Sequence, residues 1–286
     1  MIFRTRFAPS PTGPLHLGHA FSALLAHDMA QEAGGECLLR IEDIDQNRAR
    51  PEWEAQIYDD LHWLGLTWPT PVMRQSERLP SYDAALNDLW ARGLLYPCTC
   101  SRADIKNALS APQEGVPMGP DGIIYPGTCR SRASRTGPRP TDSVLRLDMA
   151  AALAQVGDLA TLSFEETGYR PAHGRVTVGR DSLMQEVGDI VLARRDMGTS
   201  YDLSVVLDDA EQRISHVVRG EDLFEATRIH VVLQGLLNLP VPVYHHHKLI
   251  RDHAGKRLAK RDDARAIALF RKEGASPADI RGMIGL

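Results

Sequence analysis

Short apolar runs and longer periodic stretches alternate along the first part of the chain. Residues 2–8 predict a strand, and the turn-forming residues 9–14 predict a loop after it. Residues 17–32 predict a helix that a glycine pair ends, and residues 36–42 have the pattern of a buried strand. A second helix begins at Pro51. Strand, helix, strand and helix in succession are typical of a parallel α/β sheet.

The α/β pattern breaks near Cys98 and returns at residue 201. Residues 110–140 are rich in Pro, Gly, Ser and Arg, and residues 144–199 contain further strand patterns. Residues 201–207 predict a strand that leads to an acidic turn. The later expected elements are a strand at 214–219, a helix at 223–237, a strand-like segment at 242–245, and one or two helices from residue 264, the last with Pro277 in its first turn.

These patterns predict an α/β nucleotide-binding domain that an inserted domain interrupts. The expected parts are residues 1–97 for the first half of this domain, 98–200 for the insertion, 201–245 for the second half, and 246–286 for a basic loop and C-terminal helices.

The composition, with 43% hydrophobic and 24% charged residues, is ordinary for a globular protein. No apolar run approaches the roughly 20 residues that span a bilayer, and no signal peptide precedes the first strand, so we expect a cytoplasmic protein. The net charge of −4 argues against a protein coated in nucleic acid but leaves room for basic patches. Two patches stand out, Arg130, Arg132, Arg135 and Arg139 in one loop, and Lys248, Arg251, Lys256, Arg257, Lys260 and Arg261 near the end. Solvated surface charge is the alternative for each.

A candidate phosphate site follows the first predicted strand, where His16, Gly18 and His19 open a helix. Free backbone N–H groups and the helix dipole favour phosphate at such a position. Gly18 allows close approach of a nucleotide, and the two imidazoles lie on one face of the first turn, where each can donate to a phosphoryl oxygen. Helix capping and packing are the alternative role for both histidines.

A second basic element, residues 255–261, follows the last strand-like segment. Gly255 permits a flexible turn, and Lys260 could reach a triphosphate that is losing pyrophosphate. Such a positive loop suits stabilisation of charge in phosphoryl chemistry. A solvated basic turn is the alternative.

Together these two elements resemble the paired signatures of class I aminoacyl-tRNA synthetases. The stretches 6–20, 40–45 and 218–222 are similar to the glutamyl branch of that class, and the similarity runs from Arg6 to about Ala264. The resemblance implies a Rossmann-like catalytic domain with an inserted domain that contacts RNA. It also implies that ATP binds to His16, Gly18, His19, Arg257 and Lys260, with Mg²⁺ arriving on the nucleotide. The family's Lys-Met-Ser-Lys-Ser signature aligns with Arg257-Leu258-Ala259-Lys260-Arg261, which puts the rate of activation in doubt.

The charges of glutamate call for opposite charges in the pocket. Arg6 and Arg219 are candidates for the γ-carboxylate, and Glu42 is a candidate for the ammonium group. The resemblance assigns glutamate to the set Arg6, Phe7, Ala8, Pro9, Ser10, Glu42, Tyr201 and Arg219. Structural ion pairs are the alternative for the charged members. The reaction needs no enzyme nucleophile, so catalysis would rest on positioning and on charge stabilisation by His16, His19 and Lys260.

Three cysteines suggest a metal site. Cys98, Cys100 and Cys129 could meet around one structural zinc ion, which prefers four ligands. The resemblance points to Tyr125 as the fourth ligand, with His173 or water as alternatives, and three free thiols as the reading without metal. Cys37 lies in a predicted strand and is expected to be a buried thiol.

The chain continues for only 25 residues after Arg261, so we expect no helical domain that reads an anticodon, as full-length family members carry. The shortened form with C-x-C and Y-x₃-C resembles the branch that activates glutamate without tRNA and transfers it to the queuosine base of tRNA(Asp). The alternatives are a truncated synthetase that charges a tRNA 3′ end and a non-catalytic RNA-binding paralogue. We expect a monomer.

Overall fold

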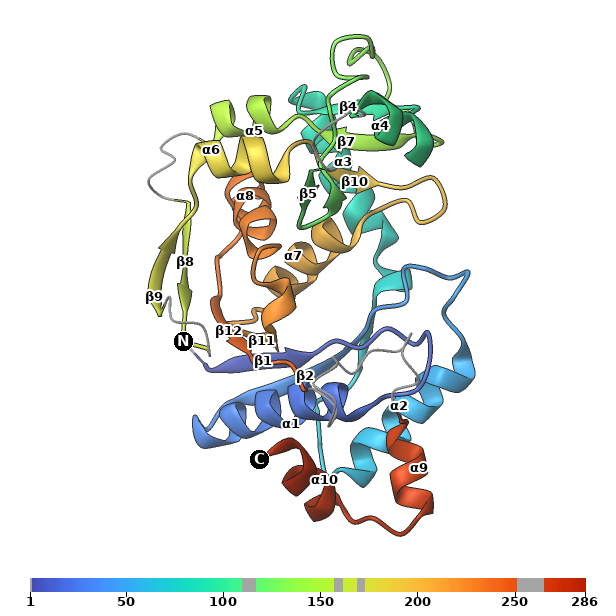
Figure 1. Ribbon diagram of the computed structural model, residues 1–286, viewed down its shortest axis with the longest axis vertical. Coiled ribbons are helices and arrows are strands. Elements are labelled where there is room, and N and C mark those ends of the chain that lie inside the picture. The colour runs from blue at the N-terminus through green and yellow to red at the C-terminus, as the bar shows by residue number, and fades with distance from the viewer. Residues whose placement is uncertain (1, 110–116, 157–161, 169–172, 251–264) are drawn as a thin grey trace.

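The computed structural model describes residues 2–109, 117–156, 162–168, 173–250 and 265–286 (Figure 1). Its first sheet is parallel and contains β1 (Arg4–Phe7), β2 (Glu36–Ile41) and β3 (Met73–Arg74). The connections between these strands contain α1 (Leu17–Glu32) and α2 (Pro51–Trp63). The strand–helix rhythm that the sequence predicts for this part of the chain is therefore confirmed.

A second sheet continues this arrangement on the other side of β1. Its order is β11 (His216–Gly220), β12 (Val243–His247), β8 (Ser163–Glu166) and β9 (Gly174–Thr177), and α8 (Thr227–Leu237) joins β11 to β12. The backbone N–H of Ser215 donates to the carbonyl of Arg4 at 3.0 Å, which fixes β11 beside β1. β8 and β12 are parallel neighbours, although about 80 residues separate them in sequence.

Residues 201–207 form a helix, so the prediction of a strand there is wrong. α7 (Tyr201–Glu211) begins at Ser200, whose hydroxyl accepts a hydrogen bond from the N–H of Leu203. The run Leu203-Ser204-Val205-Val206 is buried throughout, because α7 packs between other elements. A continuous buried run has no period that separates helix from strand, and its β-branched residues favoured the wrong choice.

The middle of the chain forms the upper part of Figure 1. An antiparallel sheet has the order β10 (Val191–Ala193), β7 (Val144–Leu147), β4 (Leu95–Cys98), and β5 (Met118–Gly119) pairs with β6 (Gly122–Ile123). The helical elements of this part are α3 (Leu79–Ala91), α4 (Arg102–Ala108), α5 (Met149–Gln155), α6 (Arg180–Ser182) and η3 (Leu183–Val187). Two short turns, η1 (Gln75–Glu77) and η4 (Glu221–Leu223), lie near the ends of β3 and β11.

The chain ends in α9 (Ile267–Lys272) and α10 (Pro277–Ile284), and Pro277 is the first residue of the last helix, as predicted. Ile267, Ile280 and Ile284 are buried in a core that they share with α1 and α2 (Figure 1). A larger core joins the middle part to α7 and α8. None of the described helices is long and apolar enough to cross a membrane.

Candidate active site and metal centre

A cavity of about 350 Å³ opens where β1 and β11 end and α1 begins. The carboxyl ends of parallel strands are the usual place for a ligand in an α/β sheet. Nine of the predicted site residues line the cavity: Arg6, Phe7, Ala8, His16, Gly18, His19, Glu42, Tyr201 and Arg219. The fold therefore brings the candidate phosphate site and most of the candidate glutamate site together.

His16 and His19 cap the N-terminus of α1. The Nδ1 atom of His16 accepts from the N–H of Gly18 at 3.1 Å, and the Nδ1 atom of His19 accepts from the N–H of His16 at 3.1 Å. Capping, the alternative role for these residues, is thus realised. It is compatible with phosphate binding, because a neutral imidazole that accepts at Nδ1 carries its proton at Nε2 and can donate from there.

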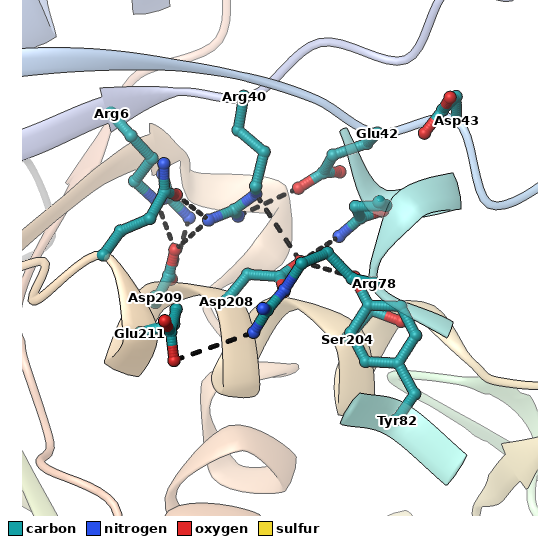
Figure 2. Close-up of polar contacts among 12 residues, drawn as sticks. Arg6, Arg40, Glu42, Asp43, Arg78, Tyr82, Ser204, Asp208, Asp209 and Glu211 are labelled. Atoms are coloured by element: carbon teal, nitrogen blue, oxygen red, sulfur yellow. Dashed lines mark hydrogen bonds and ion pairs between the residues drawn. The ribbon is translucent and has the colours of Figure 1, made fainter. Parts of the chain in front are cut away.

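Arg6 is held by an acid on α7. Its Nε and Nη2 atoms donate to the two carboxylate oxygens of Asp209 at 3.0 and 3.3 Å, and Nη1 of Arg40 donates to the same carboxylate at 2.7 Å (Figure 2). Burial alone would raise the pKa of Asp209, but the two guanidinium groups lower it to about 2. Arg6 therefore enters the cavity with its charge already paired.

The neighbouring Asp208 is the centre of a second buried group (Figure 2). Gln75, Tyr82 and Arg78 donate to its carboxylate at 2.9, 2.8 and 3.4 Å. Burial raises the pKa of Asp208 although cations lie nearby. This group ties α7 to η1 and α3 behind the cavity.

Arg219, at the end of β11, is 5% exposed and has only neutral direct partners among the described residues. Its Nε donates to Nε2 of His246 at 3.1 Å, and Nη1 lies 3.3 Å from Nδ1 of His230. Its Nη2 donates to the hydroxyl of Thr227 at 2.7 Å and to the carbonyl of Leu223 at 3.2 Å. These contacts use four of the five N–H groups of a guanidinium.

Each of the two histidines is paired with an acid on its other side. Nδ1 of His246 lies 2.5 Å from Oε2 of Glu166, and Nε2 of His230 lies 3.1 Å from Oδ1 of Asp202. Burial lowers the pKa of both histidines. Both rings are therefore neutral near pH 7.

Glu42 and Tyr201 both line the cavity. Burial raises the pKa of Glu42, and the charges of Arg40 and Arg6 oppose that rise. Nη2 of Arg40 donates to Oε1 of Glu42 at 3.1 Å, so the candidate partner of the ammonium group is also part of an ion pair. Burial, and next the charge of Glu42, raise the pKa of Tyr201 to about 12.

A second cavity of about 570 Å³ lies next to the first, and Glu42, Tyr201 and Leu223 line both. Ser10, predicted to contact glutamate, lines this second cavity. Pro9 lines neither cavity, but its carbonyl accepts from the N–H of Glu42 at 3.0 Å. The remaining predicted ATP ligands, Arg257 and Lys260, lie outside the described residues.

The three predicted metal ligands meet at the end of β4. The Sγ atoms of Cys98, Cys100 and Cys129 lie within 4.8 Å of one another. The hydroxyl of Tyr125 lies 3.4 Å from Sγ of Cys98 and 3.3 Å from Sγ of Cys100, and it accepts from the N–H of Cys129 at 2.9 Å. Of the two named candidates for a fourth ligand, Tyr125 is in the cluster and His173 is not. Cys37 is a buried thiol, as predicted.

The electrostatics of this cluster favour a cation. Although burial raises the pKa of Cys129, hydrogen bonds from Tyr125 and the backbone of Thr99 lower it to about 6. Burial and its hydrogen bonds to the three thiols raise the pKa of Tyr125, and a bound cation would oppose that rise. The guanidinium carbon of Arg146 lies 3.9 Å from the centre of the Tyr125 ring, where it would offset the negative charge of a thiolate site.

Most of the first basic patch is engaged in ion pairs. Arg130 pairs with Asp189 at 2.7 Å, and Arg135 pairs with Asp148 at 2.8 Å. Arg139 pairs with Asp83. Since acids already pair with these arginines, the loop is less suited to bind phosphate than the sequence alone suggests. In the second patch only Lys248 belongs to the described residues.

The acids and histidines that orient the two arginines were not predicted from the sequence. They are Glu166, Asp202, Asp209, His230 and His246. Two signals were available, a run of three histidines on a strand at 245–247 and a pair of adjacent acids in an apolar segment at 208–209. Such a run of histidines and such a pair of acids are unusual at buried positions unless they lie next to a charged partner.

Comparison with known proteins agrees with this architecture. The family described as tRNA synthetases class I (E and Q), catalytic domain, matches residues 2–121 and 166–286. The chain belongs to this class of catalytic domain. The model is also similar to the crystal structure of a glutamate tRNA ligase from Elizabethkingia meningosepticum in complex with its amino acid, with a TM-score of 0.77 and 27% identity. That match covers the whole of this chain and 61% of the ligase, so the chain spans less than two thirds of that protein.

Curated relatives narrow the family further. The chain is 66% identical over 284 residues to the glutamyl-Q tRNA(Asp) synthetase of Rhodobacter capsulatus, covering 99% of both chains. It is 37% identical to the protein of the same name from Nitratidesulfovibrio vulgaris, covering 100% of this chain and 86% of the relative. The chain therefore belongs to the glutamyl-Q tRNA(Asp) synthetase family.

Proposed function

We propose that this protein activates L-glutamate with ATP and transfers it to the queuosine base of tRNA(Asp), and that activation needs no tRNA. The observation that carries the first half is Arg219, a buried cation whose direct partners among the described residues are all neutral. A guanidinium buried without a direct counter-ion is costly, and a substrate carboxylate in the adjoining cavity would supply that charge. Glutamine would leave the cation unpaired, so the site favours glutamate.

The other predicted site residues have proposed roles in this reaction. The α-carboxylate of glutamate attacks the α-phosphorus of ATP, an O–P bond forms, and pyrophosphate leaves with the electron pair of the broken O–P bond. The Nε2–H groups of His16 and His19, at the positive end of α1, would donate to phosphoryl oxygens. Lys260 and Arg257 are proposed to stabilise the departing pyrophosphate, with Mg²⁺ that arrives on ATP.

The proposed acceptor is a hydroxyl of the queuosine cyclopentene ring. It would attack the glutamyl carbonyl and release AMP. The full-length likeness to proteins named glutamyl-Q tRNA(Asp) synthetase supports this acceptor. The second cavity supports it as well, because it shares the Glu42 and Tyr201 wall with the first and has room for a base turned out of an anticodon loop.

Zinc is the metal that we propose for the cysteine cluster. Zn–S bonds of about 2.3 Å and a Zn–O bond of about 2.0 Å in a tetrahedron place sulfur and oxygen about 3.5 Å apart. The distances from the Tyr125 hydroxyl to two sulfurs, 3.4 and 3.3 Å, fit that set. We propose Tyr125 as the fourth ligand of a structural zinc ion. Metal analysis of Tyr125→Phe against wild type tests this, and an unchanged zinc content and affinity in the variant would remove Tyr125 from the set.

Charging of a tRNA 3′ end is the second candidate function. The likeness to a glutamate tRNA ligase at 27% identity favours it, and the 66% identity to a glutamyl-Q tRNA(Asp) synthetase outweighs it. A cytoplasmic location and a monomeric state stay predictions.

One experiment separates the candidates. ATP–pyrophosphate exchange is measured with glutamate, glutamine and aspartate in the absence of tRNA, and exchange with glutamate is expected. Labelled glutamate is then offered to tRNA(Asp) with and without queuosine. Label that requires queuosine and survives removal of the terminal nucleotide supports the proposal. Exchange that needs tRNA, or label lost with the terminal nucleotide, contradicts it.

A further inference from the structure

Arg219 depends on two imidazole lone pairs. Its Nε–H needs an acceptor at Nε2 of His246, 3.1 Å away, and its Nη1 needs one at Nδ1 of His230, 3.3 Å away. A neutral imidazole has one donor and one acceptor nitrogen, and which is which depends on the partner of the other nitrogen. The residues that bond the other nitrogen of each histidine therefore determine how Arg219 is oriented.

Glu166 fixes the first imidazole. Its Oε2 lies 2.5 Å from Nδ1 of His246, so Nδ1 donates and Nε2 is left to accept. Its Oε1 accepts from the backbone N–H groups of His246 and Gly168 at 3.1 and 2.6 Å. A Cβ on Gly168 would lie 2.2 Å from the carbonyl oxygen of His246, so only glycine allows this close approach of backbones. The carboxylate thus has no freedom to turn.

Asp202 fixes the second imidazole from another direction. It lies in the first turn of α7, and its Oδ1 is 3.1 Å from Nε2 of His230 on α8. His230 is 1% exposed, and Asp202 is 6% exposed. Nε2 of His230 therefore donates to the acid, and Nδ1 is left to accept from Arg219.

We propose that Glu166 and Asp202 are positioning residues that act through His246 and His230 to hold Arg219 for the side chain of the amino-acid substrate. Each acid sets the tautomer of its histidine, so that the guanidinium meets two neutral acceptors and keeps its positive edge toward the cavity. The acids stabilise the buried cation from one imidazole away, without occupying the place of the substrate carboxylate. This inference rests on the proposed function, because it assigns specificity to the same pocket.

The informative variant is Glu166→Gln. The two backbone N–H groups at Oε1 require an oxygen there, so the amide NH₂ must face Nδ1 of His246. That ring nitrogen then has to accept, Nε2 becomes a donor, and it faces the Nε–H of Arg219 donor to donor. The exposed neighbour Glu165, one position along the same strand, provides the matched control Glu165→Gln.

The measurement is tRNA-independent ATP–pyrophosphate exchange at varied glutamate and varied ATP. Loss of a hydrogen bond to a charged group predicts that Glu166→Gln raises the KM for glutamate about tenfold or more. The KM for ATP should be unchanged, and the ratio of kcat/KM for glutamate to that for glutamine should fall. Asp202→Ala, which removes the acceptor for Nε2 of His230, should change the same two quantities in the same direction, and Glu165→Gln should change neither.

A purely structural role predicts a different outcome, in which less active protein lowers kcat while the KM for glutamate stays at the wild-type value. That result in Glu166→Gln overturns the inference. Should that variant fail to fold, Asp202→Ala decides the question by the same KM criterion. Wild-type protein without any glutamate-dependent exchange would instead contradict the proposed function.

Discussion

The two arginines of the candidate amino-acid pocket are equally buried, at 5% exposure each, and yet they are stabilised in opposite ways. Arg6 makes a bidentate ion pair with Asp209, which also receives Arg40. Arg219 touches imidazoles, a hydroxyl and a carbonyl, and its acids stand one ring away. Arg6 therefore has a direct counter-ion in the protein, whereas Arg219 has none among the described residues and a ligand could supply it.

This difference assigns separate tasks to residues that the sequence placed in one group. A cation with a protein counter-ion contributes shape and hydrogen bonds to the pocket, but little net attraction for an anion. A buried cation with neutral partners attracts an anion strongly, because any carboxylate that enters relieves the cost of burial. We therefore expect Arg219 to determine the preference for glutamate and Arg6 to shape the cavity.

The largest effect is expected from Arg219→Gln. Removing one partner of a buried, hydrogen-bonded charge pair costs several kcal/mol, which corresponds to a loss of about a thousandfold in kcat/KM for glutamate. Glutamate-dependent exchange kinetics measure this loss. Arg195→Gln, at an exposed position, is the control and should be near wild type. A loss of similar size in Arg6→Gln would erase the contrast between the two arginines.

The next effect concerns the two adjacent acids of α7. Asp209→Asn leaves Arg6 and Arg40 without their shared counter-charge, and it should lower the free energy of unfolding by about 3 kcal/mol. The same change at Asp208 should cost less, because the nearest cations lie farther from that carboxylate, Arg78 at 3.4 Å and Arg40 at 4.0 Å. Urea unfolding of the two variants gives the comparison. Equal losses of unfolding free energy in the two variants would show that the ion pair of Asp209 with Arg6 stabilises the protein no more than the contacts of Asp208 do.

As pH falls, the contacts of Arg219 with its histidines should weaken before the ion pair of Arg6 with Asp209 weakens. Burial lowers the folded-state pKa of His246 and His230, so the unfolded chain binds more protons as pH falls below about 6.5. The stability from the neutral rings is present above that pH and is lost as pH falls. Asp209, with a pKa near 2, keeps its charge in the folded protein until pH approaches 2, and its contribution to stability declines only below about pH 4. Glutamate KM should therefore rise at a pH below 6.5 at which circular dichroism shows that the structure persists. A KM that stays flat down to the pH at which the structure unfolds would contradict this prediction.

The sequence allowed prediction of the residues that line the cavity, but not of those that orient them. Arg6, Glu42 and Arg219 occur in local motifs at strand ends, and such positions can be recognised without a structure. Glu166 lies far from Arg219 in the chain, and Asp209 lies 203 residues from Arg6. Only the pairing of β8 with β12 and the packing of α7 against β1 bring these residues together. Contacts over such separations depend on topology, which short-range patterns do not contain.

The error at residues 201–207 has the same origin. An apolar run with Val205 and Val206 satisfies a strand or a buried helix equally, and Ser200 as an N-cap was the one local signal for a helix. The strand prediction placed Asp208 and Asp209 in a turn, where acidic side chains need no charged partners. As part of a buried helix, both acids require cations, and these cations lead directly to Arg6.

The smallest expected effect concerns a buried acid that makes neither an ion pair nor a well-formed hydrogen bond with any described residue. Asp60 on α2 is fully buried, and neither carboxylate oxygen makes a well-formed hydrogen bond to a described residue. Burial, and next the charge of Asp59, raise its pKa to about 6. The folded protein therefore binds more protons than the unfolded chain between about pH 4 and pH 6, and the cost of the bare charge is complete above that range. Asp60→Asn should raise the free energy of unfolding by about 1–2 kcal/mol at pH 8 and by about half as much at pH 5. Thermal unfolding at the two pH values measures the difference. A gain of equal size at both would mean that the carboxylate charge at this position is not what destabilises the native state.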